Sequence, residues 1–289
     1  MKFARFVVTG MLAGLLVLAA APAGAAPVAP AGTTIEPPIG CLPTAARPDP
    51  VVVLPGADGT TAQTAEQWAV MTQHLRGAGA CVLVFQGGII DGKRWAGDIP
   101  AAAVQVAQFV DRVEATTGAR KVDIVAHSAG SIVANYYLKV LHGAPNVEHA
   151  VFIASEGGGC DGAGSLAALG IKNLPITPVQ VLRTLPFMAP ILAQLLPDLA
   201  TTLQMAPGSA VYESVFVDGP VTQPGVRYAV LASKADTLAT PAGTCSFITE
   251  PGVTNVFYED LFPGRPPVDH STIRSSPDTA NWVVDQLYS

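Results

Sequence analysis

Short apolar runs alternate with helix-forming segments along most of this 289-residue chain, and this alternation limits the folds that it can adopt. Residues 51–54 form a continuous apolar run, as expected for a strand buried on both faces. Residues 99–114 place apolar side chains at helical spacing. The same signals predict further strands at 81–85, 122–126, 149–154, 228–232 and 253–258, and further helices at 67–76, 129–141 and 278–287. We therefore expect an α/β fold with a mostly parallel central sheet flanked by helices.

The composition excludes two broad classes of protein. With 49% hydrophobic and 13% charged residues, the chain can bury enough apolar surface to order itself, so it is not a disordered protein. Its formal net charge is −6, and it has no cluster of Lys and Arg. Nucleic acid and anionic membrane surfaces are both bound through basic residues. We expect no nucleic-acid partner, no stable membrane insertion and a monomeric protein.

The first 25 residues are typical of a secretory signal peptide. Lys2 and Arg5 precede an apolar run over residues 6–21, and Ala23-Gly24-Ala25 is an A-x-A cleavage pattern. An N-terminal membrane anchor is the alternative, but prolines interrupt the uncharged stretch before it reaches the length of a span. We expect cleavage near Ala25 and a secreted protein. The predicted organisation is a signal peptide at 1–25, an extended lead-in at 26–50 and one α/β domain at 51–289.

A sharp turn between a predicted strand and a predicted helix holds the first candidate for chemistry. Ala126-His127-Ser128-Ala129-Gly130 follows the G-x-S-x-G pattern with Ala in place of the first Gly. Such a turn projects its central side chain out of the sheet, and the small residues on either side let strand and helix approach. Ser128 is therefore the candidate nucleophile, and a helix-capping serine is the alternative. We expect His127 to point away from Ser128 and to be a packing residue.

The candidate acid and base lie after later strands. Asp236 comes just past the strand at 228–232, at the carboxyl end of the sheet, where open α/β sheets bind their ligands. An Asp that caps a turn is the alternative interpretation. His270 lies in a loop between the last strand and the last helix. Nucleophile, acid and histidine follow each other in the order that α/β hydrolases require.

The same fold predicts where an oxyanion hole would form. One donor is the backbone N–H of Ala129, which follows the nucleophile, and the other is the N–H of Ala57 in the Gly-rich loop after the first strand. A phosphate-binding loop is the rival interpretation of that loop, but the G-K-[ST] ending of a P-loop is missing.

Residues 157–208 interrupt the alternation of strands and helices. The segment is Gly-rich at first and then apolar, with repeated prolines. It is either an irregular insertion or a lid over the site, since long insertions in compact domains often bind ligands. Its place in the chain puts it over Ser128, so Phe187 and Leu195 are candidates for lining an acyl pocket.

Several motifs together resemble the secreted actinobacterial lipases and esterases of the α/β hydrolase superfamily, akin to the class 2 lipases and the yeast lipase B type. The matching segments are 51–56, 122–130, 135–139, 227–230 leading to Asp236, Thr240-Pro241, 251–256 and the following His270. The resemblance implies hydrolysis of carboxylic esters, lipids among them, by Ser128, Asp236 and His270 without a cofactor. An extracellular acyltransferase with the same three residues, and a non-catalytic binding protein on a hydrolase scaffold, are the alternatives.

The four cysteines allow three disulfide pairings. The resemblance suggests a bond between Cys41 and Cys81, which leaves Cys160 to pair with Cys245. No C-x-x-C spacing or adjacent His indicates a metal site, so none is expected.

Overall fold

The computed structural model describes residues 30–168, 175–185, 188 and 200–289. Its centre is a six-stranded sheet in the order β3-β2-β5-β6-β7-β8, and every pair of neighbours is parallel. The strands are β2 (Val51–Leu54), β3 (Val82–Val84), β5 (Val122–His127), β6 (Val147–Ile153), β7 (Arg227–Ala232) and β8 (Thr254–Phe257). Each predicted strand is present within two residues of its expected bounds, so the predicted α/β architecture is confirmed.

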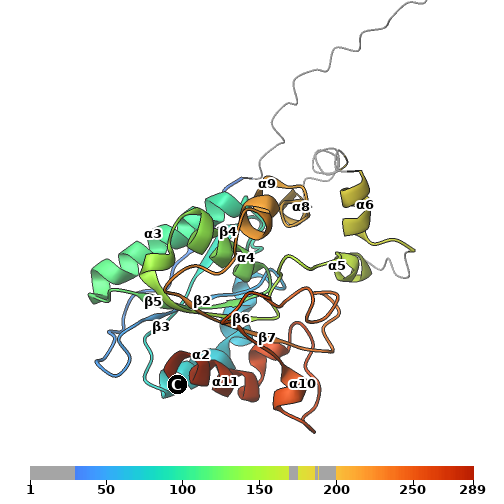
Figure 1. Cartoon of the computed structure of the whole chain (residues 1–289). Coiled ribbons are helices and arrows are strands. Elements are labelled where there is room, and N and C mark those ends of the chain that lie inside the picture. The colour runs from blue at the N-terminus through green and yellow to red at the C-terminus, as the bar shows by residue number, and fades with distance from the viewer. Residues whose placement is uncertain (1–29, 169–174, 186–187, 189–199) are drawn as a thin grey trace, which may run out of the picture.

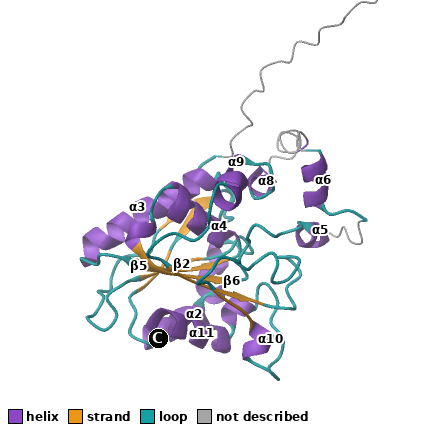
Figure 2. Ribbon diagram, in the orientation of Figure 1, coloured by secondary structure: helices purple, strands orange, loops and turns teal. Residues whose placement is uncertain are grey.

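Helices cover both faces of this sheet, which is seen nearly edge-on between them (Figures 1 and 2). One face carries α3 (Ile99–Thr117) and α4 (Ala129–Asn135), and the other carries α2 (Ala69–Gly77) and α11 (Pro277–Tyr288). Alternate residues of a strand point to opposite faces. Val52 therefore packs in the core under α3, while Val51 and Val53 pack in the core over α2 and α11.

The order of the strands fixes where a ligand would bind. The chain runs from β2 outward to β3 on one side and then crosses to β5 on the other side of β2. Neighbouring connections that leave in opposite directions create a crevice at the carboxyl ends of the strands. The loop after β2 and the turn after β5 meet at that point.

Two features of the N-terminal half were not expected from the sequence. The predicted lead-in forms β1 (Thr33–Ile35), which pairs antiparallel with β4 (Gln86–Ile89) outside the main sheet. The predicted helix at 67–76 divides into α1 (Thr64–Gln67) and α2, because the buried Trp68 leaves the helical conformation at φ −106° and ψ 6°.

The other elements are short and connect the main ones. They are η1 (Thr61–Gln63), η2 (Tyr136–Val140), η3 (Ala144–Asn146), α5 (Ala163–Ala168), α6 (Pro178–Thr184), α8 (Ala200–Gln204), α9 (Ala210–Tyr212), η5 (Glu213–Val217), α10 (Tyr258–Leu261) and η6 (Ile273–Ser275). The predicted helix at 129–141 is α4 continued by the π-helical turn η2.

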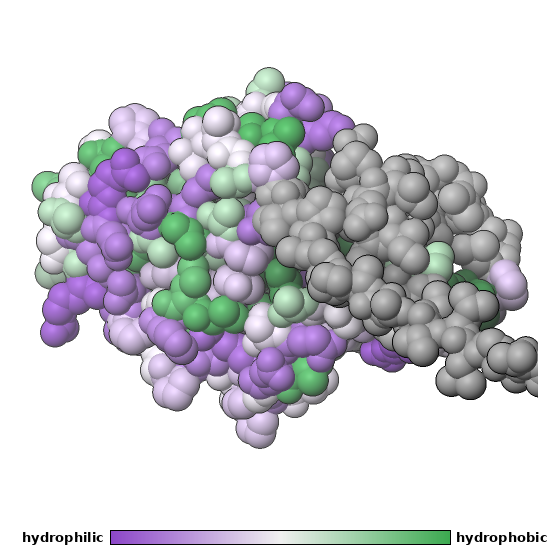
Figure 3. Space-filling model, turned by 90° about the horizontal axis from the view of Figure 1, so that it is seen from above, coloured by the Kyte–Doolittle hydropathy of each residue, from purple (hydrophilic) through white to green (hydrophobic). Residues whose placement is uncertain are grey.

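The described parts of the insertion 157–208 include α5, α6 and α8. In Figure 1, α8 lies beside α9, while α5 and α6 stand apart from α3 on the right of the view. Backbone bonds join Asp161 to Thr240 and to Val179, at 2.9 and 3.2 Å. The side chain of Gln204 donates to Asp98, at the start of α3, at 2.6 Å. Phe187, Leu195 and the predicted signal peptide lie outside the described residues. Seen from above, the described surface is largely hydrophilic, with small apolar areas between the polar groups (Figure 3).

Candidate active site

Ser128 stands on a strained turn between β5 and α4. Its backbone has φ 51° and ψ −130°, a conformation that residues with a side chain rarely adopt. The turn is possible because Gly130 lies directly against the end of β2. A Cβ on Gly130 would be 2.5 Å from the carbonyl oxygen of Leu54 and 2.7 Å from that of Pro55. The packing of helix on strand therefore requires glycine at 130 and presents Ser128 at the carboxyl edge of the sheet.

The structure brings Ser128, His270 and Asp236 into one row of hydrogen bonds. The Nε2 atom of His270 lies 2.8 Å from Ser128 Oγ, and its Nδ1 atom lies 2.8 Å from Asp236 Oδ2. The second carboxylate oxygen of Asp236 accepts from the backbone N–H groups of Leu238 and Ala239, at 2.8 and 2.9 Å. Asp236 is thus held from both sides, and His270 can take a proton from Ser128 while its other nitrogen remains protonated.

The surroundings lower the pKa of Asp236 and raise that of His270. Burial raises the pKa of Asp236, but the hydrogen bond and charge of His270, with the two backbone N–H groups, lower it below its ordinary value. Burial lowers the pKa of His270, but the hydrogen bond and charge of Asp236 outweigh burial and raise it. Asp236 is therefore ionised at neutral pH, and its charge would stabilise a protonated His270.

Three other acids in the C-terminal part of the chain lie outside this row of hydrogen bonds. The carboxylate of Asp269 accepts from the backbone N–H groups of Ser271 and Thr272, so it caps its own turn. Asp260 is exposed and pairs with Lys234. Asp218 ends the short helix η5.

His127 is a packing residue with one additional contact. It is fully buried, meets the edge of Trp68, and directs Nε2 to the backbone carbonyl oxygen of His270 at 2.7 Å. Burial lowers its pKa to about 3, so the ring is neutral, and a hydrogen bond to a carbonyl assigns the proton to Nε2. His127 therefore anchors the backbone of the loop that carries His270.

The loop that was predicted to form the oxyanion hole packs against Ser128. A Cβ on Gly56 would lie 2.9 Å from that of Ser128, so glycine is needed for this approach. The buried Arg94 donates from Nε to the carbonyl oxygen of Gly56 at 2.8 Å and from Nη1 to that of Thr60 at 2.9 Å. The carbonyl of Gly56 and the N–H of Ala57 belong to one peptide unit, so Arg94 fixes the direction of that N–H.

The second predicted oxyanion donor, the backbone N–H of Ala129, lies at the N-terminus of α4. Ala129 is the first residue of α4, and the first N–H groups of a helix have no acceptor within it. The positive end of the helix dipole also lies at this point. Negative charge that develops beside Ser128 would be stabilised there.

Sequence reasoning missed two residues of this site. Arg94 comes from the loop after β4, and nothing in its local sequence indicates where its side chain reaches. Glu156 follows the end of β6, and its Oε1 lies 3.3 Å from Ser128 Oγ. An acid just after a buried strand, at the carboxyl end of the sheet, was a signal that could have identified Glu156.

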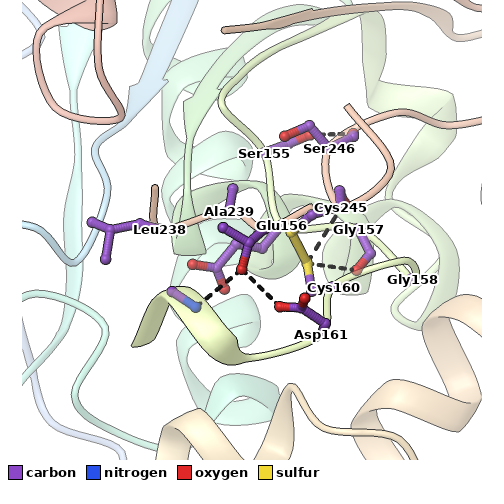
Figure 4. The surroundings of a disulfide bond; sticks show 12 residues. Ser155, Glu156, Gly157, Gly158, Cys160, Asp161, Leu238, Ala239, Cys245 and Ser246 are labelled. Carbon is purple, nitrogen blue, oxygen red and sulfur yellow. Dashed lines mark hydrogen bonds between the residues drawn. A yellow bond between two sulfur atoms is a disulfide. The ribbon is translucent and has the colours of Figure 1, made fainter. Parts of the chain in front are cut away.

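A disulfide fastens two loops beside this row. Cys160 is bonded to Cys245, and Cys41 to Cys81, as the sequence had suggested. Figure 4 shows the first of these bonds next to Glu156, Leu238 and Ala239. It joins the loop after β6 to the loop after Asp236, and the backbone N–H of Gly157 donates to the carbonyl of Cys245 at 2.7 Å.

The described residues contain neither a metal-binding cluster nor a membrane-spanning helix. No group of three or more His, Cys, Asp or Glu residues in that part of the chain is arranged to hold a metal ion. Among the helices that the structure describes, none has the length and apolar character needed to cross a bilayer.

Part of the chain matches a known protein family. Residues 48–152 match the sequence profile of the family described as lipase (class 2). No curated protein matches the chain.

Solved structures resemble the whole chain at low sequence identity. The lipase BlEst2 of Bacillus licheniformis in its mature form is 15% identical, covers 90% of this chain and 99% of its own, and has a TM-score of 0.54. An enol-lactonase from Burkholderia xenovorans is 15% identical over 89% of this chain and 95% of its own, with a TM-score of 0.51. An α/β hydrolase fold protein from Chitinophaga pinensis is 13% identical over 89% and 96%, also with a TM-score of 0.51. The chain has the α/β hydrolase fold, and its residues 48–152 match the family described as lipase (class 2).

Proposed function

We propose that this chain is a secreted serine hydrolase of carboxylic esters, a lipase or esterase that works through an acyl-enzyme. The observation that carries the proposal is the row Ser128–His270–Asp236, with both hydrogen bonds at 2.8 Å. The match to class 2 lipases over residues 48–152, which include Ser128, supports the same reaction class.

The geometry suits a two-step acyl transfer to water. Ser128 Oγ attacks the ester carbonyl carbon while its proton passes to His270 Nε2, and Asp236 stabilises the resulting imidazolium. The N–H groups of Ala57 and Ala129 would stabilise the negative oxygen of the tetrahedral intermediate. The alcohol leaves with the proton of His270. A water molecule then attacks the acyl-enzyme by the same route and releases the acid. These steps need no cofactor.

The expected place of action is outside the cell. The N-terminal 25 residues have the pattern of a signal peptide, and both pairs of cysteines are joined as disulfides. Disulfides form and persist in oxidising compartments. We propose cleavage near Ala25 and release of the mature chain.

The apolar insertion points to substrates with acyl chains. Within residues 174–205 the charged residues are Arg183 and Asp198 alone, among many Leu, Ile and Val. Polar substitutions at Phe187 or Leu195 should reduce turnover of long-chain esters more than that of acetate esters, because each buried CH₂ contributes about 0.8 kcal/mol. Equal losses on both would assign these residues to the core instead.

The deciding experiment replaces the nucleophile. Ser128→Ala should lower hydrolysis of p-nitrophenyl butyrate by about a thousandfold or more, because these residues act as a unit, and should abolish labelling by an organophosphonate. Ser214→Ala, in the short helix η5, is the matched control and should keep full activity. Turnover in Ser128→Ala at the level of the unmodified enzyme would refute the proposal.

A further inference from the structure

Two side chains contact the Oγ atom of Ser128. The proposed mechanism uses one of them, His270, and gives no role to the other, Glu156. His270 Nε2 lies 2.8 Å from Oγ, and Glu156 Oε1 lies 3.3 Å from it. A serine hydroxyl has one proton and two lone pairs. The hydroxyl can therefore donate to only one of these two groups. When it donates to His270 Nε2, the longer contact at 3.3 Å is attractive only if the Glu156 carboxyl carries a proton of its own.

The backbone on both sides of Glu156 is fixed. Its own N–H donates to Ser131 Oγ at 3.2 Å, in the first turn of α4. Ser155 Oγ donates to the carbonyl of Ser246 at 2.6 Å, and the Gly157 N–H donates to that of Cys245 at 2.7 Å. A Cβ on Gly157 would lie 2.7 Å from the same Cys245 oxygen. The loop after β6 therefore packs tightly against the segment that holds Cys245 and Ser246, and the Cys160–Cys245 disulfide joins the two.

The surroundings favour the neutral form of this carboxyl. Burial raises the pKa of Glu156, and the charge of Asp236 raises it further, while His270 and the Ser128 hydroxyl act in the opposite direction. The titratable groups that face Glu156 are His270, in the loop before α11, and Asp236, in the loop after β7. The hydroxyl of Ser128, in the turn before α4, and that of Ser131, in α4, also contact Glu156.

We propose that Glu156 is a further catalytic residue, which donates a hydrogen bond as a carboxylic acid to Ser128 Oγ and assists deacylation. This inference rests on the proposed function. In deacylation, water adds to the acyl carbon and gives a proton to His270. The bond from carbon to Oγ then breaks, and His270 returns the proton to Oγ. Negative charge builds on Oγ as that bond breaks, and the Glu156 O–H stabilises it without transferring its own proton.

The first test separates the two half-reactions. Glu156→Leu removes the donor, so the mature enzyme should release a burst of p-nitrophenol from p-nitrophenyl butyrate, followed by a steady rate at least tenfold below that of the unmodified enzyme. The rate of organophosphonate labelling, which reports acylation, should change less than threefold. Glu66→Leu, on the exposed helix α1, is the matched control and should leave both rates unchanged.

The second test uses pH and a variant of nearly the same shape. In the unmodified enzyme the deacylation rate should fall at alkaline pH, because ionised Glu156 opposes charge on Oγ. Glu156→Gln keeps an N–H donor and has no charge, so its rate should stay level there.

Three results would overturn the inference. They are an equal loss of labelling and deacylation in Glu156→Leu, full deacylation in that variant, and an alkaline fall retained in Glu156→Gln. Absence of Ser128 labelling in the unmodified enzyme would instead refute the proposed function itself.

Discussion

At the scale of single residues, the site connects three titratable groups to Ser128. His270 and Glu156 contact its Oγ directly, and Asp236 is connected to it through His270. The pKa of Asp236 is lowered and those of His270 and Glu156 are raised. Groups whose environments shift their pKa values in opposite directions can take distinct roles as charge stabiliser, base and neutral donor. Asp236 differs from Glu156 in having two backbone N–H donors and the Nδ1 side of His270. The backbone therefore decides which carboxyl is ionised.

Asp236→Asn tests this division of roles. The variant loses the hydrogen bond and charge that raise the pKa of His270, and burial, which lowers it, remains. The acid limb of kcat/KM, where His270 must lose its proton, should therefore move to lower pH. The rate on the plateau should fall by about a thousandfold to ten-thousandfold, because the imidazole no longer has a fixed tautomer. A pH–rate profile measures both effects. The exposed Asp260→Asn is the control, and an unmoved acid limb would contradict the assignment.

At the scale of elements, the site is assembled by side chains that cross from one loop to another. Arg94, from the loop after β4, binds the loop after β2. Burial lowers its pKa to about 10, so it remains a cation at neutral pH. Asp58, in the loop after β2, accepts from Ser271 at 2.8 Å and from Arg274. Ser271 follows His270 directly in the chain, and Arg274 lies in η6. The oxyanion loop and the histidine loop are thus held relative to each other through Asp58.

Arg94→Met should therefore act on catalysis more than on substrate binding. Without the guanidinium the Gly56–Ala57 peptide is free to turn, and kcat should fall about tenfold to a hundredfold because an oxyanion donor is misplaced. KM for p-nitrophenyl butyrate should change by a small factor. The melting temperature should fall as well, because the substitution removes a buried charged group that is hydrogen-bonded to the loop after β2. Arg112→Met is the control, because its ion pair with Glu36 is exposed and such pairs contribute little. A raised KM with unchanged kcat would contradict this role.

At the scale of the whole molecule, the sequence predicts the strands, helices and turns that short stretches of residues determine by themselves. Continuous apolar runs predicted the buried strands β2 and β6, and the strand-turn-helix pattern predicted the sharp turn at Ser128. The pair β1–β4 was not predicted, because Gln86-Gly87-Gly88-Ile89 shows neither an apolar run nor an alternation. The contacts of Arg94 and Glu156 depend on the courses of loops 38 and 28 residues away in the chain. Such contacts follow from tertiary packing, which a single sequence does not display.

The two disulfides have different places in the molecule, and their removal should separate stability from activity. Each bond typically contributes about 2–4 kcal/mol to the free energy of unfolding, so either pair of Cys→Ala substitutions should lower Tm. Cys41–Cys81 ties the lead-in to the start of β3, far along the sheet from Ser128. Cys160–Cys245 closes the loops of Glu156 and Asp236. Below its melting temperature the Cys41→Ala/Cys81→Ala variant should keep kcat, whereas Cys160→Ala/Cys245→Ala should lose at least several-fold. Calorimetry and turnover of p-nitrophenyl butyrate measure the two effects, and equal kcat in both variants would show that the second bond does not order the site.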